Sequence, residues 1–445
     1  MTFRRRPRIV IVGAGFAGYQ CARALIDRAR GAAEIVLINP NDYFLYLPLL
    51  PDVAGGALEP RRATVSLTGT LRGVRLVLGE ADGLDVKGRT VSYTDPEGTH
   101  GRIGYDRLVL TVGSVNKLLP VPGIAQHAHG FRGMGEALYL RDHITRQVEM
   151  AATAASEAER RARTTFVVVG AGYTGTEVTA QGVRLTETLH RRDDTLRHGP
   201  SPQWLLVDIA DRVLPELDPR LSATADRVLR GRGVRVRTGT SISEATAEGA
   251  RLSDGTFVPT HTLVWCVGVR PDPFVASLGL PTEKGRLCVE PTLRVPGHPE
   301  VYACGDAAAV PDLTHPGELT AMTAQHAHRQ GRLAAANIAA SFGHGTERDY
   351  RHHDLGFMVD LGGTDAAANP FGLPLAGLPA AAVTRAYHLL SLPGNRARVA
   401  SDWALDAVLP RHGVQLGLVP SGAVPLETSS PTAAPGDRSR TVRRE

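Results

Sequence analysis

The chain alternates short, almost wholly apolar runs with longer stretches in which apolar and polar residues are mixed. The runs Arg8–Val12 and 34–38 are typical of strands that are buried on both faces. The pattern returns far downstream, at Thr165–Val169 and 203–207. A helix-like segment separates the strands of each pair and begins near Phe16 in the first. The pattern therefore predicts two β-α-β units in one chain.

A glycine fingerprint follows the first strand of the first unit. Gly13, Gly15 and Gly18 have the spacing G-x-G-x-x-G, which permits a tight turn, close approach of a pyrophosphate and close packing of helix on strand. The start of the helix then presents free N–H groups to the phosphates. Asn39 ends the next strand, where an acidic residue normally holds a ribose; its side-chain oxygen still accepts a hydrogen bond, without charge.

The second unit carries a better-formed fingerprint at Gly170, Gly172 and Gly175. Its next strand ends in Asp208, and a carboxylate there suits the two free ribose hydroxyls of NAD and repels the 2′-phosphate of NADP. The alternative for Asp208 is an ordinary turn or helix-cap acid. Arg212 lies close by in the sequence, which leaves NADPH use open.

A third motif, PEVYACGDAAAV, spans residues 299–310. It predicts a strand that ends at Cys304, and Gly305 and Asp306 are expected just before a helix. An aspartate in such a turn can accept hydrogen bonds from ribityl hydroxyls. Residues 107–114 and 262–272 are predicted strands that end in glycine, placed where a chain can cross between two domains. One nucleotide domain is thus expected for a bound flavin and the other for a nicotinamide.

Composition agrees with a multidomain globular protein of 445 residues, which is too long for one simple core. The net charge of +5 is weak for this length, and we expect no nucleic-acid partner. No apolar run reaches the length of a membrane-spanning helix. No cysteine pair has the spacing of a metal site or a local disulfide, so we expect no metal and a reducing compartment. The cysteines are Cys21, Cys266, Cys288 and Cys304.

The order and spacing of these motifs, over about residues 8–340, resemble the two-dinucleotide-binding-domain flavoproteins. The resemblance implies an FAD site and an NAD(H) site. The implied FAD residues are Gly13, Gly15, Gly18, Asn39 and Asp306, and the implied NAD(H) residues are Gly170, Gly172, Gly175 and Asp208.

Finer motifs resemble the type II NADH:quinone oxidoreductases. Residues 41–62 are similar to the family's segment after the second strand, and GAGYTGTE places Glu177 where the family has a glutamate near the nicotinamide and flavin rings. Residues 320–338 resemble its A-Q-x-A-x-Q helix, which puts Gln325 beside the flavin and the quinone pocket. Glu177 and Gln325 are thus the implied catalytic residues. The second glutamine of that motif is replaced by Arg329.

The predicted fold is α/β, with two Rossmann-like dinucleotide-binding domains and a C-terminal α+β domain. The expected ranges are 1–120 and 266–345 for FAD, 121–265 for NAD(H), 346–420 for the C-terminal domain and 421–445 for a disordered tail. By the resemblance, NADH gives a hydride to FAD, and the electrons pass to a quinone. A homodimer and a cytoplasmic protein in peripheral contact with the cytoplasmic face of the inner membrane are also implied, although the tail lacks a clear amphipathic helix.

Other chemistries stay open at this point. Disulfide reductases need cysteines within 39–60, which contains none, and Cys266 and Cys304 fit small buried hydrophobes better than the pair of a sulfide:quinone reductase. A soluble NAD(P)H-dependent FAD reductase that serves a small redox protein needs only the two nucleotides and a docking surface. A nucleotide-sensing flavoprotein with little turnover is the third class.

Overall fold

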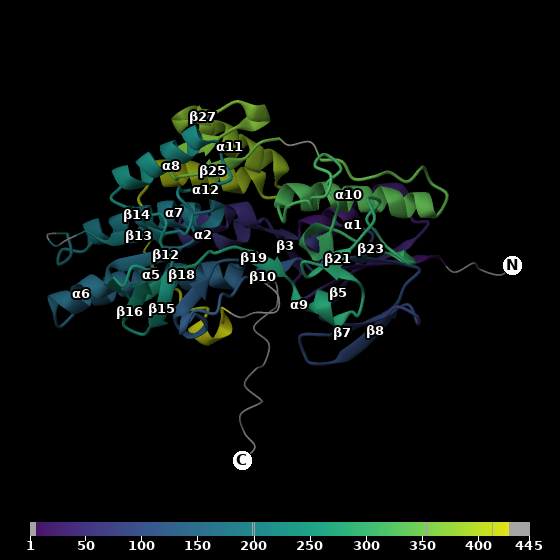
Figure 1. The fold of residues 1–445 in the computed structure, drawn as a ribbon, viewed down its shortest axis with the longest axis horizontal. Coiled ribbons are helices and arrows are strands. Elements are labelled where there is room, and N and C mark those ends of the chain that lie inside the picture. The colour runs from purple at the N-terminus through teal and green to yellow at the C-terminus, as the bar shows by residue number, and fades with distance from the viewer. Residues whose placement is uncertain (1–5, 198, 200, 353–354, 412, 427–445) are drawn as a thin grey trace, which may run out of the picture.

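The computed structural model describes residues 6–197, 199, 201–352, 355–411 and 413–426. Two mainly parallel sheets lie on opposite sides of the molecule, and a small C-terminal layer lies over the second sheet, at the top left of Figure 1. Both sheets are built from apolar strands such as β1 (Arg8–Val12) and β12 (Thr165–Val169), whose side chains are almost wholly buried. The two predicted β-α-β units are therefore present, one in each sheet.

The first sheet has six strands and combines the beginning of the chain with residues near 300. Its order is β22 (Arg294–Val295), β23 (His298–Ala303), β9 (Arg107–Leu110), β1, β2 (Glu34–Asn39) and β5 (Val74–Leu78). All neighbours are parallel except β22 and β23. Helices α1 (Phe16–Ala29) and α10 (Ala324–Ser341) pack on this sheet side by side. A Cβ added at Gly331 of α10 would lie 2.1 Å from the carbonyl oxygen of Ala17, so the two helices are almost in backbone contact.

The second sheet has five parallel strands from a continuous part of the chain. Its order is β11 (Ala128–Gly130), β18 (Thr262–Trp265), β12, β13 (Gln203–Val207) and β14 (Arg235–Arg237). Its helices are α5 (Met134–Ala152), α6 (Glu157–Arg163), α7 (Tyr173–Arg192) and α8 (Pro219–Gly231). Two antiparallel strands, β10 (Ser114–Asn116) and β19 (Val269–Pro271), carry the chain between the two sheets where the sequence predicted crossings.

The remaining elements lie outside the two main sheets, and most of them are short. The small strands are β3 (Tyr43–Leu45), β4 (Thr64–Ser66), β6 (Glu80–Asp85), β7 (Thr90–Thr94), β8 (His100–Gly104), β15 (Ile242–Thr246), β16 (Gly249–Leu252), β17 (Phe257–Pro259), β20 (Thr282–Glu283), β21 (Arg286–Cys288) and β24 (Ala308–Ala309). The short helices are α2 (Leu50–Ala54), α3 (Leu67–Thr70), α4 (Ile124–His127) and α9 (Pro273–Ser277). The C-terminal layer contains β25 (Met358–Asp360), β26 (Ala366–Ala368), β27 (Leu375–Ala376), α11 (Gly377–Ser391) and α12 (Arg396–Val408).

Two expectations differ from the structure. The helix expected directly after Asp306 is a single 3₁₀ turn, Gly305–Ala307, because β24 follows it and pairs with β21. The tail expected from residue 421 begins too early: Ser421–Ala423 form a 3₁₀ turn, and Leu426 is 1% exposed in the core around the second sheet. The rest of that tail, 427–445, lies outside the described residues. The predicted domain boundaries stay a prediction.

Candidate active site: two glycine loops, a cavity and a carboxyl cluster

The first glycine loop lies at the carboxyl end of β1. Gly13 has φ +94°, and a Cβ there would lie 2.4 Å from the carbonyl oxygen of Thr111. A Cβ at Gly18 would lie 1.9 Å from the carbonyl oxygen of Gly13, so only glycine permits this packing of helix on loop. At Gly15, by contrast, no atom of the described chain beyond its two sequence neighbours lies within 4 Å of the Cβ position. The loop therefore closes tightly at its first and third glycines and opens at its second.

The second loop, at the end of β12, repeats this geometry. Gly170 has φ +102°, and a Cβ there would lie 2.2 Å from the carbonyl oxygen of Cys266. A Cβ at Gly175 would lie 1.8 Å from the carbonyl oxygen of Gly170. The Cβ position of Gly172 again has no neighbour within 4 Å among the described residues. This open space at the second glycine of each loop fits the close approach of a pyrophosphate.

The residues at the ends of the second strands, Asn39 and Asp208, occupy equivalent places. Asn39 Oδ1 accepts a hydrogen bond of 2.8 Å from the backbone N–H of Ala14. Asp208 Oδ2 accepts one of 2.5 Å from Ala171, and its Oδ1 accepts one of 2.7 Å from Ala210. Each side chain thus fixes the glycine loop from the neighbouring strand. Only Asp208 adds a negative charge.

A cavity of about 1000 Å³, including its open mouth, extends from the first glycine loop toward α10. Asp306 lines it, and its Oδ2 accepts a short hydrogen bond from the Ser114 hydroxyl. Arg132 also lines the cavity, and its guanidinium lies 3.5 Å from Asp306 Oδ2. Gln330 stabilises the turn Gly305–Ala307, because its Oε1 accepts a hydrogen bond of 2.8 Å from the Gly305 N–H. The long cavity beside a glycine loop fits a dinucleotide whose second half lies along the turn at Asp306.

Glu177 and Gln325 both contact the C-terminal layer, from α7 and α10 respectively. Glu177 Oε1 accepts a hydrogen bond of 3.0 Å from the backbone N–H of Asp360. Burial and the nearby negative charges of Asp360 and Asp52 raise the pKa of Glu177 well above its usual value. Gln325 donates 2.7 Å to the carbonyl of Gly356, while its Oε1 is buried without a hydrogen-bond partner in the described part of the chain. An acceptor of this kind is available to a bound donor.

Comparison with known proteins decides the family. Residues 7–331 match the family model of pyridine nucleotide-disulphide oxidoreductases. The chain is 33% identical to the type II NADH:quinone oxidoreductase NdhA of Mycobacterium tuberculosis, over 90% of this chain and 86% of the relative. The chain belongs to the type II NADH:quinone oxidoreductase family.

Other members of this family are similar along nearly their whole length. An internal alternative NAD(P)H-ubiquinone oxidoreductase A1 from Solanum tuberosum mitochondria is 28% identical, over 92% of this chain and 88% of the relative. The structure of NDH2 from Plasmodium falciparum in complex with NADH superposes with a TM-score of 0.83 at 18% identity, over 92% of this chain and all of that one. The predicted fold class and the predicted cofactors, FAD and NAD(H), are confirmed.

The cysteines separate this family member from the disulfide reductases of the wider family. All four are free thiols. Burial raises the pKa of Cys266 and of Cys304 to about 12, so neither carries a thiolate at neutral pH. Cys21 is buried too, and its pKa is also raised. These side chains act as small apolar packing groups, in agreement with the sequence interpretation.

Several residues of the site escaped the sequence analysis. Arg132 belongs to no motif, and Gln330 lies in the segment 320–338 without having been given a role; only the fold brings them to Asp306 and Gly305. Asp52 lies in the segment 41–62 but was given no role, and Asp360 lies in a stretch without a local signal. Together with burial, the negative charges of both raise the pKa of Glu177. A cluster of buried carboxyl groups cannot be predicted from local sequence patterns when its residues come from separate elements.

Proposed function

We propose that this chain oxidises NADH and passes the electrons through FAD to a quinone. The observation that carries the proposal is the pair of equivalent glycine loops, each open at its second glycine, in one chain. Glu177 and Gln325 each form a hydrogen bond with the backbone between residues 356 and 360. Relatives at 33% and 30% identity bear the name type II NADH:quinone oxidoreductase.

The proposed roles follow from position. The loop with Gly13, Gly15 and Gly18 holds the FAD pyrophosphate, with Asn39 fixing the loop, and Asp306 accepts hydrogen bonds from the ribityl chain. The second loop holds NADH. Its residues are Gly170, Gly172 and Gly175, with Asp208 on the ribose hydroxyls.

The protein supplies orientation and electrostatics for this reaction. FAD, when bound, accepts the hydride of NADH and passes two electrons on. Glu177 sits near the N-terminus of the second fingerprint helix, in a half-buried position, with a raised pKa. It therefore keeps a proton at pH values where an ordinary glutamate has lost it. The Oε1 of Gln325, which has no partner among the described residues, is available to accept a hydrogen bond from a bound molecule.

Anaerobic stopped-flow absorbance on the purified yellow protein tests the proposal. NADH is expected to bleach the flavin within one turnover, and a short-chain quinone mixed in afterwards is expected to restore the colour. Bleaching without recovery would contradict quinone as acceptor and direct the search to a small redox protein. Absence of bleaching would contradict the nicotinamide site.

We also propose a peripheral contact with an anionic membrane surface. Ten of the fifteen large apolar side chains that the structure exposes lie between residues 371 and 418. Leu405, Val408 and Leu409 follow helical spacing along and just past α12, at 53%, 77% and 56% exposure. Next to them, the exposed Arg191 and Arg192 line a pocket with Leu409 and Pro410, while Arg184 and Arg411 in the same pocket are ion-paired with Asp406. Apolar side chains beside clustered arginines suit acyl chains beside anionic headgroups.

Flotation with vesicles that contain anionic phospholipid checks this contact. The double variant Leu405→Glu/Val408→Glu is expected to bind at least about tenfold more weakly, because each apolar side chain contributes roughly 1.5–3 kcal/mol when buried. Phe257→Glu replaces an apolar residue that is 38% exposed on β17, in the sheet β15-β16-β17 and outside the C-terminal layer, and is expected to bind like the unchanged chain. Equal binding of both variants would contradict the proposed surface.

Among the described residues, no helix is both long and apolar enough to cross a membrane. The homodimer and the cytoplasmic location implied by the resemblance stay predictions.

A further inference from the structure

The pocket between the last turns of α7 and the end of α12 is a cavity of about 640 Å³, including its open mouth. Its charged lining residues are Arg184, Arg191, Arg192, Arg411 and Asp406, an excess of three positive charges, and we call it the arginine pocket. It shares no lining residue with the cavity beside the first glycine loop. Arg184 lies eleven residues after Tyr173, the first residue of α7, which is roughly 16 Å along the helix. The arginine pocket is therefore separate from both nucleotide sites.

One face of α7 supplies three of these arginines. Arg191 and Arg192 follow Arg184 by seven and eight residues, a spacing that places all three on the same side of a helix. Arg191 pairs with Glu187 at 2.9 Å, but its side chain is 75% exposed, and exposed pairs of this kind contribute little to stability. Arg192, the last residue of the helix, is exposed too. Like charges on one helix face repel, so an anion between them is stabilised.

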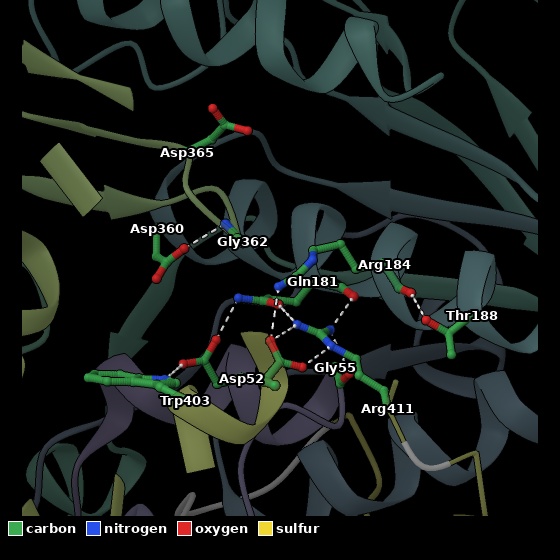
Figure 2. Close-up of polar contacts among 12 residues, drawn as sticks. Asp52, Gly55, Gln181, Arg184, Thr188, Asp360, Gly362, Asp365, Trp403 and Arg411 are labelled. Atoms are coloured by element: carbon green, nitrogen blue, oxygen red, sulfur yellow. Dashed lines mark hydrogen bonds and ion pairs between the residues drawn. The ribbon is translucent and has the colours of Figure 1, made fainter. Parts of the chain in front are cut away.

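Asp406 neutralises only part of this charge. Its Oδ1 accepts a hydrogen bond of 2.7 Å from Arg411 Nε, and its Oδ2 accepts a longer one of 3.2 Å from Arg184. Arg411 is buried and also donates to the Gly55 carbonyl at 2.7 Å and to Gln181 Oε1 at 2.8 Å (Figure 2). Burial and the positive charge of Arg411 lower the pKa of Arg184, although Asp406 opposes this. Arg184 is therefore short of negative charge even with Asp406 beside it.

We propose that the arginine pocket binds one phosphate group, held by the guanidinium groups of Arg184, Arg191 and Arg192. The forked guanidinium group matches the oxygens of a phosphate and binds them in pairs. Leu409 and Pro410 give the pocket an apolar wall, which suits a phosphate on a phospholipid headgroup better than a free phosphate ion. The phosphate site goes beyond the proposed NADH oxidation, and its occupation by a lipid rests on the proposed membrane contact.

The arginine pocket lies where three parts of the fold meet. Arg184 belongs to α7, Asp406 belongs to α12, and Arg411 reaches the carbonyl of Gly55 directly after α2. A ligand that binds only the folded chain raises its apparent stability. We therefore expect dihexanoyl phosphatidate, a soluble short-chain phospholipid, to raise the midpoint of thermal unfolding of the flavin-loaded protein as its concentration increases.

Isothermal titration calorimetry on the flavin-loaded protein measures the binding directly, with inorganic phosphate and dihexanoyl phosphatidate as the two ligands. One phosphatidate is expected to bind per chain, more tightly than inorganic phosphate. Arg191→Gln/Arg192→Gln is expected to bind phosphatidate at least about tenfold more weakly, because each arginine beside an anionic lipid contributes a factor on the order of five. Arg191→Lys/Arg192→Lys keeps both charges and loses the forks, so a roughly threefold loss is expected.

Two further variants serve as controls. Arg161→Gln removes an arginine on α6 that is 69% exposed and pairs with Glu157 four residues earlier, as Arg191 pairs with Glu187, and is expected to bind like the unchanged chain. Asp406→Asn removes the competing negative charge and keeps an oxygen for Arg411, so binding is expected to tighten roughly threefold. A purely structural defect does not move the affinity in opposite directions.

The outcomes separate the phosphate site from the membrane contact. No binding of either ligand would overturn the inference, and so would an affinity that both double variants leave unchanged. Equal affinities for inorganic phosphate and phosphatidate would support the site and assign it to free phosphate. Absence of flotation with anionic vesicles in the unchanged chain, with phosphate still bound in calorimetry, would instead contradict the proposed membrane contact.

Discussion

Gly172→Val is expected to lower kcat/KM for NADH about a hundredfold and to leave the FAD content unchanged. At this position φ is −73° and ψ is −169°, an extended conformation that valine adopts without strain. Apart from Gly172 and its two chain neighbours, no atom of the described protein lies within 4 Å of the added Cβ, so the free energy of unfolding is expected to stay nearly constant. The side chain instead fills the space proposed for the pyrophosphate. Charge-assisted hydrogen bonds contribute about 1.5–3 kcal/mol each, so losing one or two gives this factor.

The matched variant is Gly15→Val in the first loop. Its backbone is nearly the same, with φ −68° and ψ −168°, and its Cβ position is equally open within the described chain. This variant is expected to be purified without FAD while it still binds NADH in calorimetry. Flavin absorbance, thermal unfolding and NADH kinetics on the two proteins check the pair. An exchange of the two outcomes would reverse the proposed assignment of the loops.

Asp208→Asn is expected to shift the ratio of kcat/KM for NADH over NADPH by about tenfold or more toward NADPH. The amide oxygen can still accept the N–H of Ala171, as Asn39 accepts that of Ala14 in the first loop. The variant therefore removes the charge and keeps the anchor of the loop. Loss of a like-charge repulsion of a few kcal/mol supports a factor of this size.

Arg212 limits how far this shift goes. Its guanidinium donates to the carbonyl oxygens of Pro215 and Leu217, at 2.7 and 3.3 Å, and so is engaged by the backbone. Residual preference for NADH is therefore expected in Asp208→Asn. Steady-state rates with both nucleotides measure the ratio, and a similar thermal unfolding midpoint serves as the control for the loop. An unchanged ratio would contradict Asp208 as the ribose residue.

The sequence predicts the glycine loops well because their physics is local. Gly13, Gly170 and the strands before them depend on backbone conformation within a few residues, and the same spacing recurs twice. The parallel strands are equally easy to predict from the sequence, because strands that are buried on both faces are apolar throughout. The chain crossings at 107–114 and 262–272 were predictable for the same reason.

The rest of the site depends on long-range contacts. The pair Asp306 and Arg132, and the cluster of Asp52, Glu177 and Asp360, join residues from separate elements with no shared motif. The prediction of a helix directly after Asp306 was wrong because β24 pairs with β21, and this tertiary contact outweighs the local helix preference. The predicted start of the tail at residue 421 was wrong because Leu426 is buried in the core around the second sheet, a long-range contact that the short run SGAVP before it does not signal.

The interrupted first sheet has a consequence for biosynthesis. β23 (His298–Ala303) pairs with β9 (Arg107–Leu110), whereas the five-stranded sheet lies wholly between Ala128 and Trp265. During translation the second sheet therefore has all its strands outside the ribosome before the first sheet can close. Because nascent domains fold as units, we expect the second sheet to fold first. Until β23 is synthesised, β9 keeps an unpaired edge, which is a binding site for chaperones.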